Sequence, residues 1–214
     1  MTVKKVDLGH EIFANCYVII DEKTGESAIV DPAYFNEKIE AAFKEAGVGN
    51  LKYILLTHGH FDHILGVHGL KEATGAKVVI HKDDAEFLAD PDKSLAAGNF
   101  PEPQIPVEAD ITVSDGDELF LGDELIRVIS TPGHTMGSVC YALENDRVLI
   151  TGDTLFCMTA GRTDFYGGNE SMLIESLKRL IALDGDYRVL PGHNRETTLE
   201  RERTRNWYIR RMVK

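Results

Sequence analysis

The chain has 214 residues, 43% of them hydrophobic and 27% charged, and its formal net charge at pH 7 is −12. These values are ordinary for a soluble globular enzyme and predict a single domain over residues 1–214. The negative charge disfavours binding to nucleic acid, and no segment approaches the roughly 20 apolar residues of a membrane span. We therefore expect neither nucleic acid nor a membrane as a partner.

The N-terminal segment and the cysteines predict a cytoplasmic protein. Residues 1–5 lead into alternating sequence without the apolar core of a signal peptide. Cys16, Cys140 and Cys157 are widely spaced within apolar, strand-like runs, which favours buried, reduced thiols over disulfides. The charge is uneven along the chain, because residues 195–214 contain seven basic and three acidic side chains.

The first half of the chain predicts strands interleaved with helices. Apolar and β-branched runs predict strands at 3–8, 15–20, 27–30, 51–56 and 76–80. Apolar residues at helical spacing predict helices at 35–46, 64–73 and 83–88. Four prolines lie between residues 90 and 106, so an irregular loop is expected there.

The second half repeats the order of strands followed by helices. Short apolar runs predict strands at 107–113, 118–121, 125–129, 138–143, 147–150 and 187–190. Helical spacing predicts helices at 170–183 and 198–209. Two batches of strands, each with its own helices, predict two sheets packed face to face with helices outside.

The segment Thr57-His58-Gly59-His60-Phe61-Asp62-His63 holds four potential metal ligands directly after the predicted strand at 51–56. Alternate side chains of an extended segment point the same way, so His58 and His60 can face one ion. Asp62 and His63 break this alternation and would point from the following turn at a second position. Zinc binds imidazole and carboxylate, takes about four ligands and keeps an open position in catalytic sites. Two ions therefore require further ligands.

Three further candidates, His134, Asp153 and His193, stand far along the chain. Each follows a predicted strand and a turn of small residues. A sheet would present such side chains together at one edge. A single histidine of this kind is more often a hydrogen-bonded structural residue, but that interpretation does not explain a whole set at strand ends.

This order of ligands resembles the metallo-β-lactamase superfamily of binuclear metallohydrolases. Within it, Gly-Asp-Thr-Leu-Phe at 152–156, Gly-Arg-Thr-Asp at 161–164 and Pro-Gly-His at 191–193 resemble the small bacterial glyoxalase II-like (hydroxyacylglutathione hydrolase-like) enzymes. The resemblance covers roughly Cys16 to Thr204. It implies the αββα sandwich of the metallo-β-lactamase fold, in the α/β (α+β) class.

The resemblance also implies two divalent metal ions, with zinc as the first expectation and iron or manganese as alternatives. One ion would be bound by His58, His60 and His134. The other would be bound by Asp62, His63 and His193, with Asp153 bridging both.

The implied activity is that of a thioesterase in which two ions share a water and lower its pKa. Asp62 and Asp153 would be the catalytic carboxylates, Asp62 also orienting the resulting hydroxide. The expected substrate is a small anionic thioester, and the expected assembly is a monomer or homodimer. A cytoplasmic location argues against an antibiotic-hydrolysing lactamase, which bacteria normally export.

Arg162 and Tyr166 are the candidate substrate-binding residues. Arg162 would meet a substrate carboxylate, as basic residues near this position do in glyoxalase II-like enzymes, or would pair with Asp164 and shape its loop. Tyr166 would add an aromatic or hydroxyl contact. The remaining histidines, His10, His68 and His81, are not expected to bind metal.

Other members of the superfamily provide alternatives. Persulfide dioxygenases share the fold and the Gly-Arg-Thr-Asp motif but use a single iron. Electron-transferring diiron relatives typically have Glu where this chain has His60. Full-length glyoxalase II carries a further helical domain that holds glutathione, so glutathione recognition stays open. A metal-stabilised binding module without turnover is the third alternative.

Overall fold

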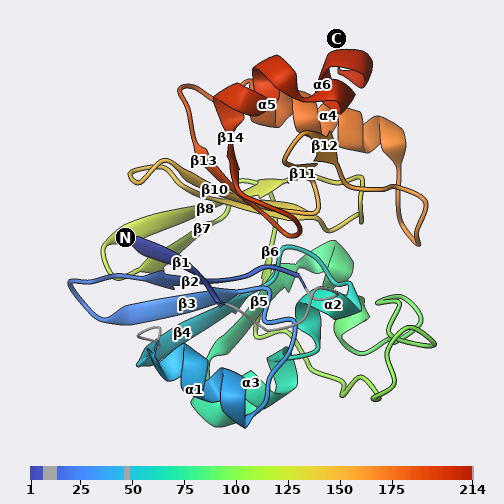
Figure 1. Ribbon diagram of the computed structural model, residues 1–214. Helices are drawn as coiled ribbons and strands as arrows, with labels where there is room; N and C mark the ends of the chain where they lie inside the picture. The colour runs from blue at the N-terminus through green and yellow to red at the C-terminus, as the bar shows by residue number, and fades with distance from the viewer. Residues whose placement is uncertain (7–13, 46–48, 214) are drawn as a thin grey trace.

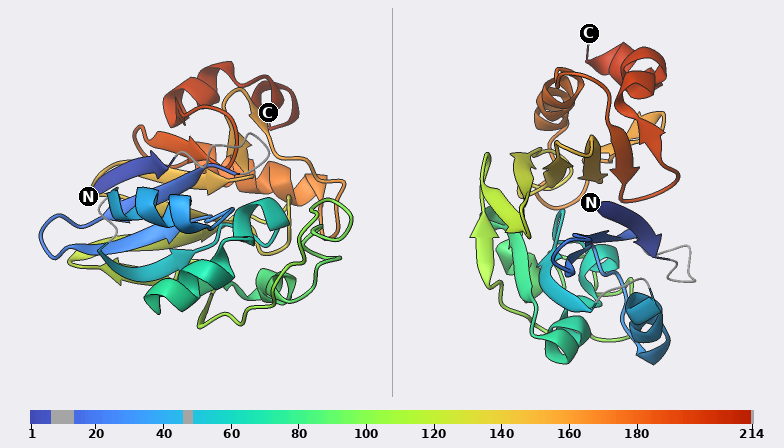
Figure 2. Two further views of the ribbon diagram at one scale, coloured as in Figure 1. Left: turned by 60° about the horizontal axis from the view of Figure 1, so that its bottom comes forward. Right: turned by 90° about the vertical axis from the view of Figure 1, so that its left-hand side faces the viewer.

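The computed structural model describes residues 1–6, 14–45 and 49–213. Two six-stranded sheets pack against each other, and helices cover the outer face of each sheet (Figure 1, Figure 2). This is the αββα sandwich expected from the order of strands and helices. None of the helices in the described part of the chain has the length and apolar character needed to cross a bilayer.

The first sheet has the order β1-β2-β3-β4-β5-β6. Its strands are β1 (Thr2–Val6), β2 (Cys16–Ile20), β3 (Glu26–Val30), β4 (Asn50–Leu55), β5 (Lys77–His81) and β6 (Ile111–Val113). The first three strands pair antiparallel, and β3 to β6 pair parallel. The helical segments of this half are α1 (Glu37–Glu45), α2 (Phe61–Ile64), α3 (Val67–Thr74) and the 3₁₀ helix η1 (Lys82–Leu88).

The second sheet has the order β14-β13-β10-β9-β8-β7. Its strands are β7 (Glu118–Leu121), β8 (Glu124–Ser130), β9 (Val139–Leu143), β10 (Val148–Gly152), β13 (Arg188–Pro191) and β14 (Thr197–Thr198). A small hairpin, β11 (Leu155–Phe156) with β12 (Thr159–Ala160), follows β10. The helices over this sheet are α4 (Glu170–Ile181), α5 (Leu199–Arg205) and α6 (Trp207–Met212).

The main core lies between the two sheets, and each sheet has a second core under its helices. Strand β2 shows why its run is apolar throughout. Tyr17 and Ile19 point to the core between the sheets, whereas Cys16 and Val18 point to the core under the helices. Because successive side chains of a strand alternate between faces, a strand buried on both faces needs an unbroken apolar run.

The predicted helix at 198–209 is wrong as a single element. The chain forms α5 and α6 instead, separated by Asn206, whose backbone is extended. The buried Asn206 side chain accepts hydrogen bonds from the backbone N–H groups of Tyr208 and Ile209. It therefore caps a new helix, as asparagine commonly does.

Two other predicted boundaries also change. The helix expected at 64–73 is divided into α2 and α3, because the backbone N–H of Gly66 donates to the carbonyl oxygen of Pro32 at 2.8 Å and not to the preceding turn. The strand expected at 107–113 pairs only from Ile111, since the backbone N–H of Val107 donates to Leu88 instead. The predicted strand at 3–8 extends beyond the described residues.

The cysteines generate a first prediction. Cys16 and Cys140 are free and buried, and Cys157 is half-buried and free. Burial raises the pKa of Cys16 well above its ordinary value and raises the pKa of Cys140 to about 12. Because the thiolate is the reactive form, only Cys157 should react with iodoacetamide in the folded protein. Mass spectrometry should find one labelled thiol in native protein and three in denaturant.

The Cys157→Ser variant is the matched control, and it should show no native labelling. Rapid labelling of Cys16 or Cys140 in folded protein would contradict the burial of these side chains.

Candidate metal centre

Seven candidate ligands lie at one edge of the sandwich, after four strands. Residues 57–63 follow β4 of the first sheet. From the second sheet, His134 follows β8, Asp153 follows β10 and His193 follows β13. The structure brings all seven residues into overlapping groups whose ligand atoms lie within 4.8 Å of one another. Sequence reasoning thus predicted which side chains meet.

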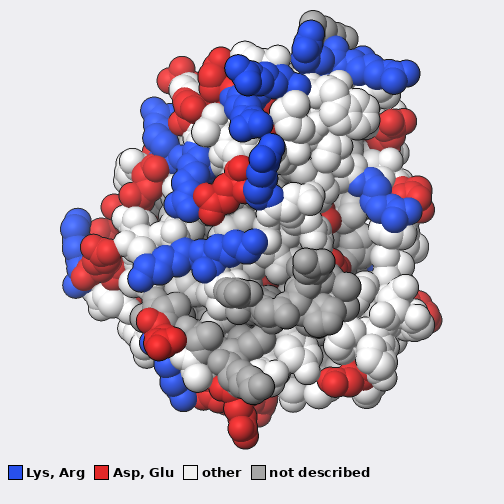
Figure 3. All heavy atoms as spheres, in the orientation of Figure 1, with Lys and Arg blue, Asp and Glu red and all other residues white. Residues whose placement is uncertain are grey.

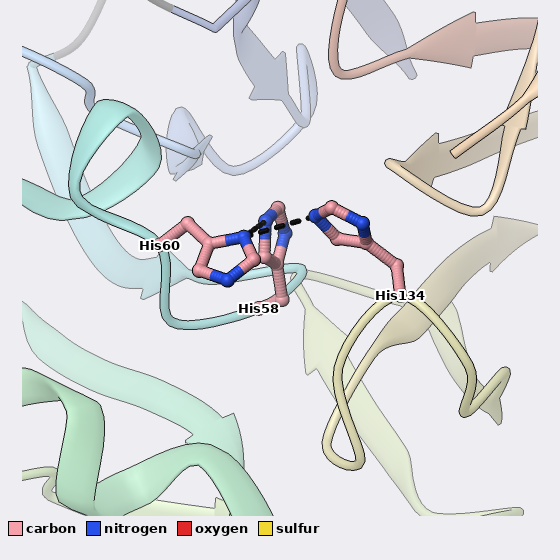
Figure 4. A group of neighbouring side chains, drawn as sticks. All are labelled: His58, His60 and His134. Atoms are coloured by element: carbon pink, nitrogen blue, oxygen red, sulfur yellow. Dashed lines mark hydrogen bonds between the residues drawn. The ribbon is translucent and has the colours of Figure 1, made fainter. Parts of the chain in front are cut away.

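Three imidazoles form the first group (Figure 4). His60 Nδ1 lies 3.1 Å from His58 Nε2 and 2.9 Å from His134 Nε2. Nitrogens bound to one tetrahedral zinc lie about 3.3 Å apart, given Zn–N bonds of roughly 2.0–2.1 Å. The observed spacing is close to that value.

Hydrogen bonds on the far side of two rings fix which nitrogen carries the proton. His134 Nδ1 lies 2.7 Å from the carbonyl oxygen of Arg162, which can only accept a hydrogen bond. His58 Nδ1 lies 3.1 Å from Thr57 Oγ1, whose own proton goes to Asp31. Both rings therefore direct the unprotonated Nε2 at His60. A proton on His60 Nδ1 could satisfy only one of them, whereas a cation satisfies all three.

The second group contains Asp62, His63 and His193. Asp62 Oδ2 lies 3.0 Å from His193 Nε2 and 3.8 Å from His63 Nε2. Asp31 Oδ2 lies 2.9 Å from His63 Nδ1, so that nitrogen donates to the carboxylate and Nε2 faces the other members of the group. This carboxylate–histidine arrangement is the usual support of a metal-binding imidazole.

Asp153 lies between the two groups. Its Oδ1 is 3.4 Å from His63 Nε2, and its Oδ2 is 3.5 Å from His134 Nε2 and 3.7 Å from His193 Nε2. No larger residue fits at position 192, because a Cβ on Gly192 would overlap Asp153 Oδ1. This contact accounts for the glycine in Pro-Gly-His.

Unsatisfied buried atoms show that the residues fit cations. His63 Nε2 and Asp153 Oδ1 are buried and lack a hydrogen-bond partner, although they face each other. Buried polar atoms are almost always satisfied, so atoms of this kind need an explanation. An ion between an imidazole lone pair and a carboxylate supplies one. The donor set of imidazoles and carboxylates suits zinc or iron.

The pKa values of His58 and His60 agree with this fit. The surrounding carboxylates outweigh burial and raise the pKa of His63, so an ion there would displace a proton. Burial and the neighbouring His134 lower the pKa of His60 to about 3, and burial and His63 lower the pKa of His58. Both rings are therefore neutral and ready to bind a cation at neutral pH. Burial alone would raise the pKa of Asp153, but the surrounding histidines outweigh it and hold that pKa far below the ordinary value.

Asp31 is the functional residue that sequence reasoning missed. It follows β3, and its carboxylate accepts from the backbone N–H of Thr57 at 2.8 Å, from Thr57 Oγ1 at 2.7 Å and from His63 Nδ1. It thus anchors the ligand segment at both ends. Its backbone has a positive φ of 52°, which is uncommon outside glycine. The available signal was a carboxylate placed directly between a strand and a proline.

The substrate pocket opens beside these ligands, with a volume of about 560 Å³. Its walls combine the ligands with apolar and amide side chains. The lining residues are His60, Phe61, Asp62, Leu95, Asn99, His134, Asp153, Phe156, Thr159, Ala160, Arg162, Phe165, His193 and Asn194. The irregular loop expected at 90–106 therefore contributes to the wall through Leu95 and Asn99.

Arg162 lines the pocket, and its guanidinium forms a two-pronged pair with Asp164, with Nε–Oδ1 and NH2–Oδ2 distances of 2.6 Å. Tyr166 is half exposed, near Phe87 and Lys93, and is not one of the lining residues. The aromatic side chain in the wall is its neighbour Phe165, which stacks on Arg162. Sequence reasoning missed Phe165, since adjacent aromatic residues cannot be assigned to inside and outside without the loop conformation.

The remaining histidines lie apart from the ligands. His81 is buried and caps η1 by accepting from the backbone N–H of Asp83. Within the described residues, neither His81 nor His68 belongs to a group that could hold an ion. His10 lies outside the described residues.

The sequence matches the family described as the metallo-beta-lactamase superfamily over residues 11–193. The chain belongs to this superfamily. Its members are mostly metal-dependent hydrolases. The chain is 34% identical over 200 residues to the probable metallo-hydrolase YqgX of Bacillus subtilis, a match that covers 92% of this chain and 93% of that protein.

A second relative has a more specific name. The chain is 38% identical over 155 residues to a hydroxyacylglutathione hydrolase of Brucella anthropi. That match covers 72% of this chain and 52% of the enzyme, so this chain corresponds to about half of the enzyme's length.

Solved structures with different names share the fold. BLEG-1, described as a B3 metallo-beta-lactamase, has a TM-score of 0.90 at 31% identity, with coverage of 97% and 99% of the two chains. ETHE1 from Myxococcus xanthus has a TM-score of 0.78 at 31% identity, covering 100% of this chain and 85% of that one. TTHA1623, crystallised in a di-iron-bound form, has a TM-score of 0.84 at 32% identity, covering 96% and 99%.

The ligand geometry predicts that metal-free protein binds about two zinc ions per chain and is stabilised by them. A ligand that binds only the folded state at 100 times its dissociation constant adds about 2.7 kcal/mol of stability. We expect Asp153→Ala to lose occupancy at both positions, because this carboxylate faces both groups. Elemental analysis and melting temperatures with and without zinc measure these effects.

His81→Gln is the control, because His81 is buried but lies apart from the ligands. It should keep the wild-type metal content. A single tightly bound iron that zinc does not replace would contradict the two-ion prediction.

Proposed function

We propose that the protein is a binuclear metal-dependent thioesterase of the hydroxyacylglutathione hydrolase type. The observation that carries this proposal is the complete set of seven ligands beside a 560 Å³ pocket. Among the described residues that line the pocket, there is no serine, cysteine or lysine to act as a nucleophile. Thr159 is the one hydroxyl side chain among these residues, and the carboxylates belong to the candidate ligands, so we take water as the nucleophile.

The reaction transfers the acyl group of a thioester to water. Oxygen of water bonds to the acyl carbon, the carbon–sulfur bond breaks, and the thiolate leaves and is protonated. When bound, divalent ions lower the pKa of a water and polarise the acyl carbonyl. A thiolate leaves readily, so the pocket needs no dedicated general acid.

The chain's own residues orient the reactants. Asp62 is ionised at neutral pH, because His63 and His193 outweigh the effect of burial and lower its pKa. Its carboxylate can accept a hydrogen bond from the attacking water. Phe156 and Phe165 provide apolar wall that favours an acyl or thioether chain and excludes bulk water.

Arginine side chains near the pocket favour binding of an anionic substrate. Because the whole chain carries a net charge of −12, capture of an anion depends on cations near the pocket. Arg162 lies in the pocket wall, and Arg195 follows the lining residues His193 and Asn194. Lys and Arg side chains also gather over α5 and α6, in the upper part of the face shown in Figure 3.

Two alternative activities have structural support. The similarity to ETHE1 favours a persulfide dioxygenase with one iron, and the similarity to BLEG-1 favours β-lactam hydrolysis. The thioesterase is preferred because the chain retains both ligand groups and resembles hydroxyacylglutathione hydrolase in sequence.

Purified protein loaded with zinc should hydrolyse a hydroxyacylglutathione, and Asp153→Ala should lose at least about a hundredfold in kcat/KM. Release of the thiol measures the reaction. The same preparations, loaded with zinc or iron, are assayed for oxygen uptake with a persulfide and for β-lactam hydrolysis. Oxygen uptake or β-lactam hydrolysis without thioester hydrolysis would refute the thioesterase.

Arg162 distinguishes substrate binding from loop support. The two hydrogen bonds from Arg162 lower the pKa of Asp164 to about 2, so the pair stays intact at any working pH. If Arg162 binds a substrate carboxylate, Arg162→Ala should raise KM for an anionic thioester on the order of tenfold and spare a neutral one. The measurement is kcat and KM for matched anionic and neutral thioesters.

Asp164→Asn is the matched variant, because it frees the guanidinium from its present partner. Substrate binding predicts a lower KM for the anionic thioester in this variant. A role in loop support predicts that both variants lose activity on both substrates and melt earlier.

A further inference from the structure

The 3₁₀ helix η1 lies between the two loops that carry His58, His60 and His134. Asp84 in this helix is fully buried, and its carboxylate accepts three hydrogen bonds. Oδ2 accepts from the backbone N–H of Gly59 at 3.0 Å and from Thr135 Oγ1 at 2.6 Å. Oδ1 accepts from the backbone N–H of Gly137 at 2.7 Å. One carboxylate thus joins a ligand loop of the first sheet to a ligand loop of the second.

The residues that donate these hydrogen bonds lie next to the three histidines in the sequence. Gly59 lies between His58 and His60, and Thr135 follows His134. A shift of Asp84 therefore moves the backbone that carries each of the three imidazoles. No other carboxylate in the described part of the chain accepts hydrogen bonds from both loops.

Two glycines let η1 approach this closely. A Cβ at Gly137 would overlap the Asp84 carboxylate, and a Cβ at Gly59 would overlap Phe87 on the next turn of η1. The separation of the two loops is therefore specified by packing on η1 as well as by hydrogen bonds.

The second ligand group has different supports. His63 is held by Asp31, and the loop of His193 is held by Asn15, whose side-chain amide donates to the carbonyl oxygens of Pro191 and Asn194. Among the described residues, the hydrogen bonds of Asp84 end on Gly59, Thr135 and Gly137 and not on any of these residues. Asp84 therefore anchors only the first group, whereas Asp31 reaches His58 through Thr57 and His63 directly.

We propose that Asp84 is a positioning residue for the three-histidine metal position, and that it sets the affinity of this position without affecting the position formed by Asp62, His63 and His193. The inference rests on the proposed function only in that these histidines bind an ion. Asp84 acts through the loops that carry the ligands, since its hydrogen bonds end on Gly59, Thr135 and Gly137 and not on an imidazole.

The test replaces Asp84 by asparagine, which keeps the shape but directs an amide N–H at a backbone N–H. Zinc affinity is measured by competition with a chromophoric chelator in two backgrounds. His193→Ala retains the three-histidine position, and His134→Ala retains the other. We expect Asp84→Asn to weaken zinc binding about 10- to 100-fold in the first background and to leave it unchanged in the second.

Glu202→Gln is the matched control. Glu202 is as buried as Asp84 and also accepts three hydrogen bonds, from Met158 N, Thr197 Oγ1 and Asn206 Nδ2, but it lies in α5. Glu202→Gln should lower the melting temperature about as much as Asp84→Asn does. It should leave the zinc affinity unchanged in both backgrounds. Thr135→Val removes one of the three donors and serves as a milder variant if Asp84→Asn does not fold.

Three results would overturn the proposal. The first is an unchanged zinc affinity in both Asp84→Asn and Thr135→Val. The second is an equal loss of zinc affinity in the two backgrounds. The third is a loss of zinc affinity from Glu202→Gln as large as that from Asp84→Asn. Zinc titration does not depend on turnover, so a protein without thioesterase activity would still support the role of Asp84 if the selective loss is found.

Discussion

The fold depends on one constraint, which is that several imidazoles and carboxylates must be buried together with their binding atoms facing inward. Burying polar atoms without partners is costly. The chain limits this cost by satisfying the outward-facing nitrogens of His58, His63 and His134 with Thr57, Asp31 and a carbonyl oxygen. The inward-facing nitrogens of these three rings are left for ions. The surrounding structure therefore fixes protonation as well as position.

The anchoring groups are distributed unequally between the two sheets. Asp31 and Asp84 both belong to the first half of the chain, after β3 and in η1. The second sheet contributes the segment of Thr135 and Gly137, which binds to Asp84. Consequently the metal centre is complete only when both halves have packed on each other, and ion binding should add to the cohesion of the two sheets.

The sequence was sufficient to predict which candidate ligands lie close together, because each follows a strand and strands of a sheet end at a common edge. It was insufficient where a distant partner decides the conformation. Asn206 interrupts a region of helical periodicity because its buried side chain is bound by Glu202 and Thr159, which no local pattern reveals. Asp31 and Asp84 were missed for the same reason. Each binds segments that are more than 20 residues away.

The metal centre alone does not determine the reaction. Relatives with the same fold carry names as different as hydroxyacylglutathione hydrolase, B3 metallo-beta-lactamase and ETHE1. Specificity must therefore come from the parts of the pocket that are not ligands. In this chain these parts are the hairpin of β11 and β12, the loop with Arg162 and Phe165, and the segment with Leu95 and Asn99.

The side chains of Arg162 and Asp164 differ from the ligand loops in how they are held. Arg162 and Asp164 are exposed and bind mainly each other, whereas the ligand loops are tied to buried carboxylates. An exposed pair can exchange partners at little cost, since solvent screens its charges. The Arg162 side chain can therefore take a new partner while the candidate ligands stay in place, which makes this part of the wall suited to setting specificity.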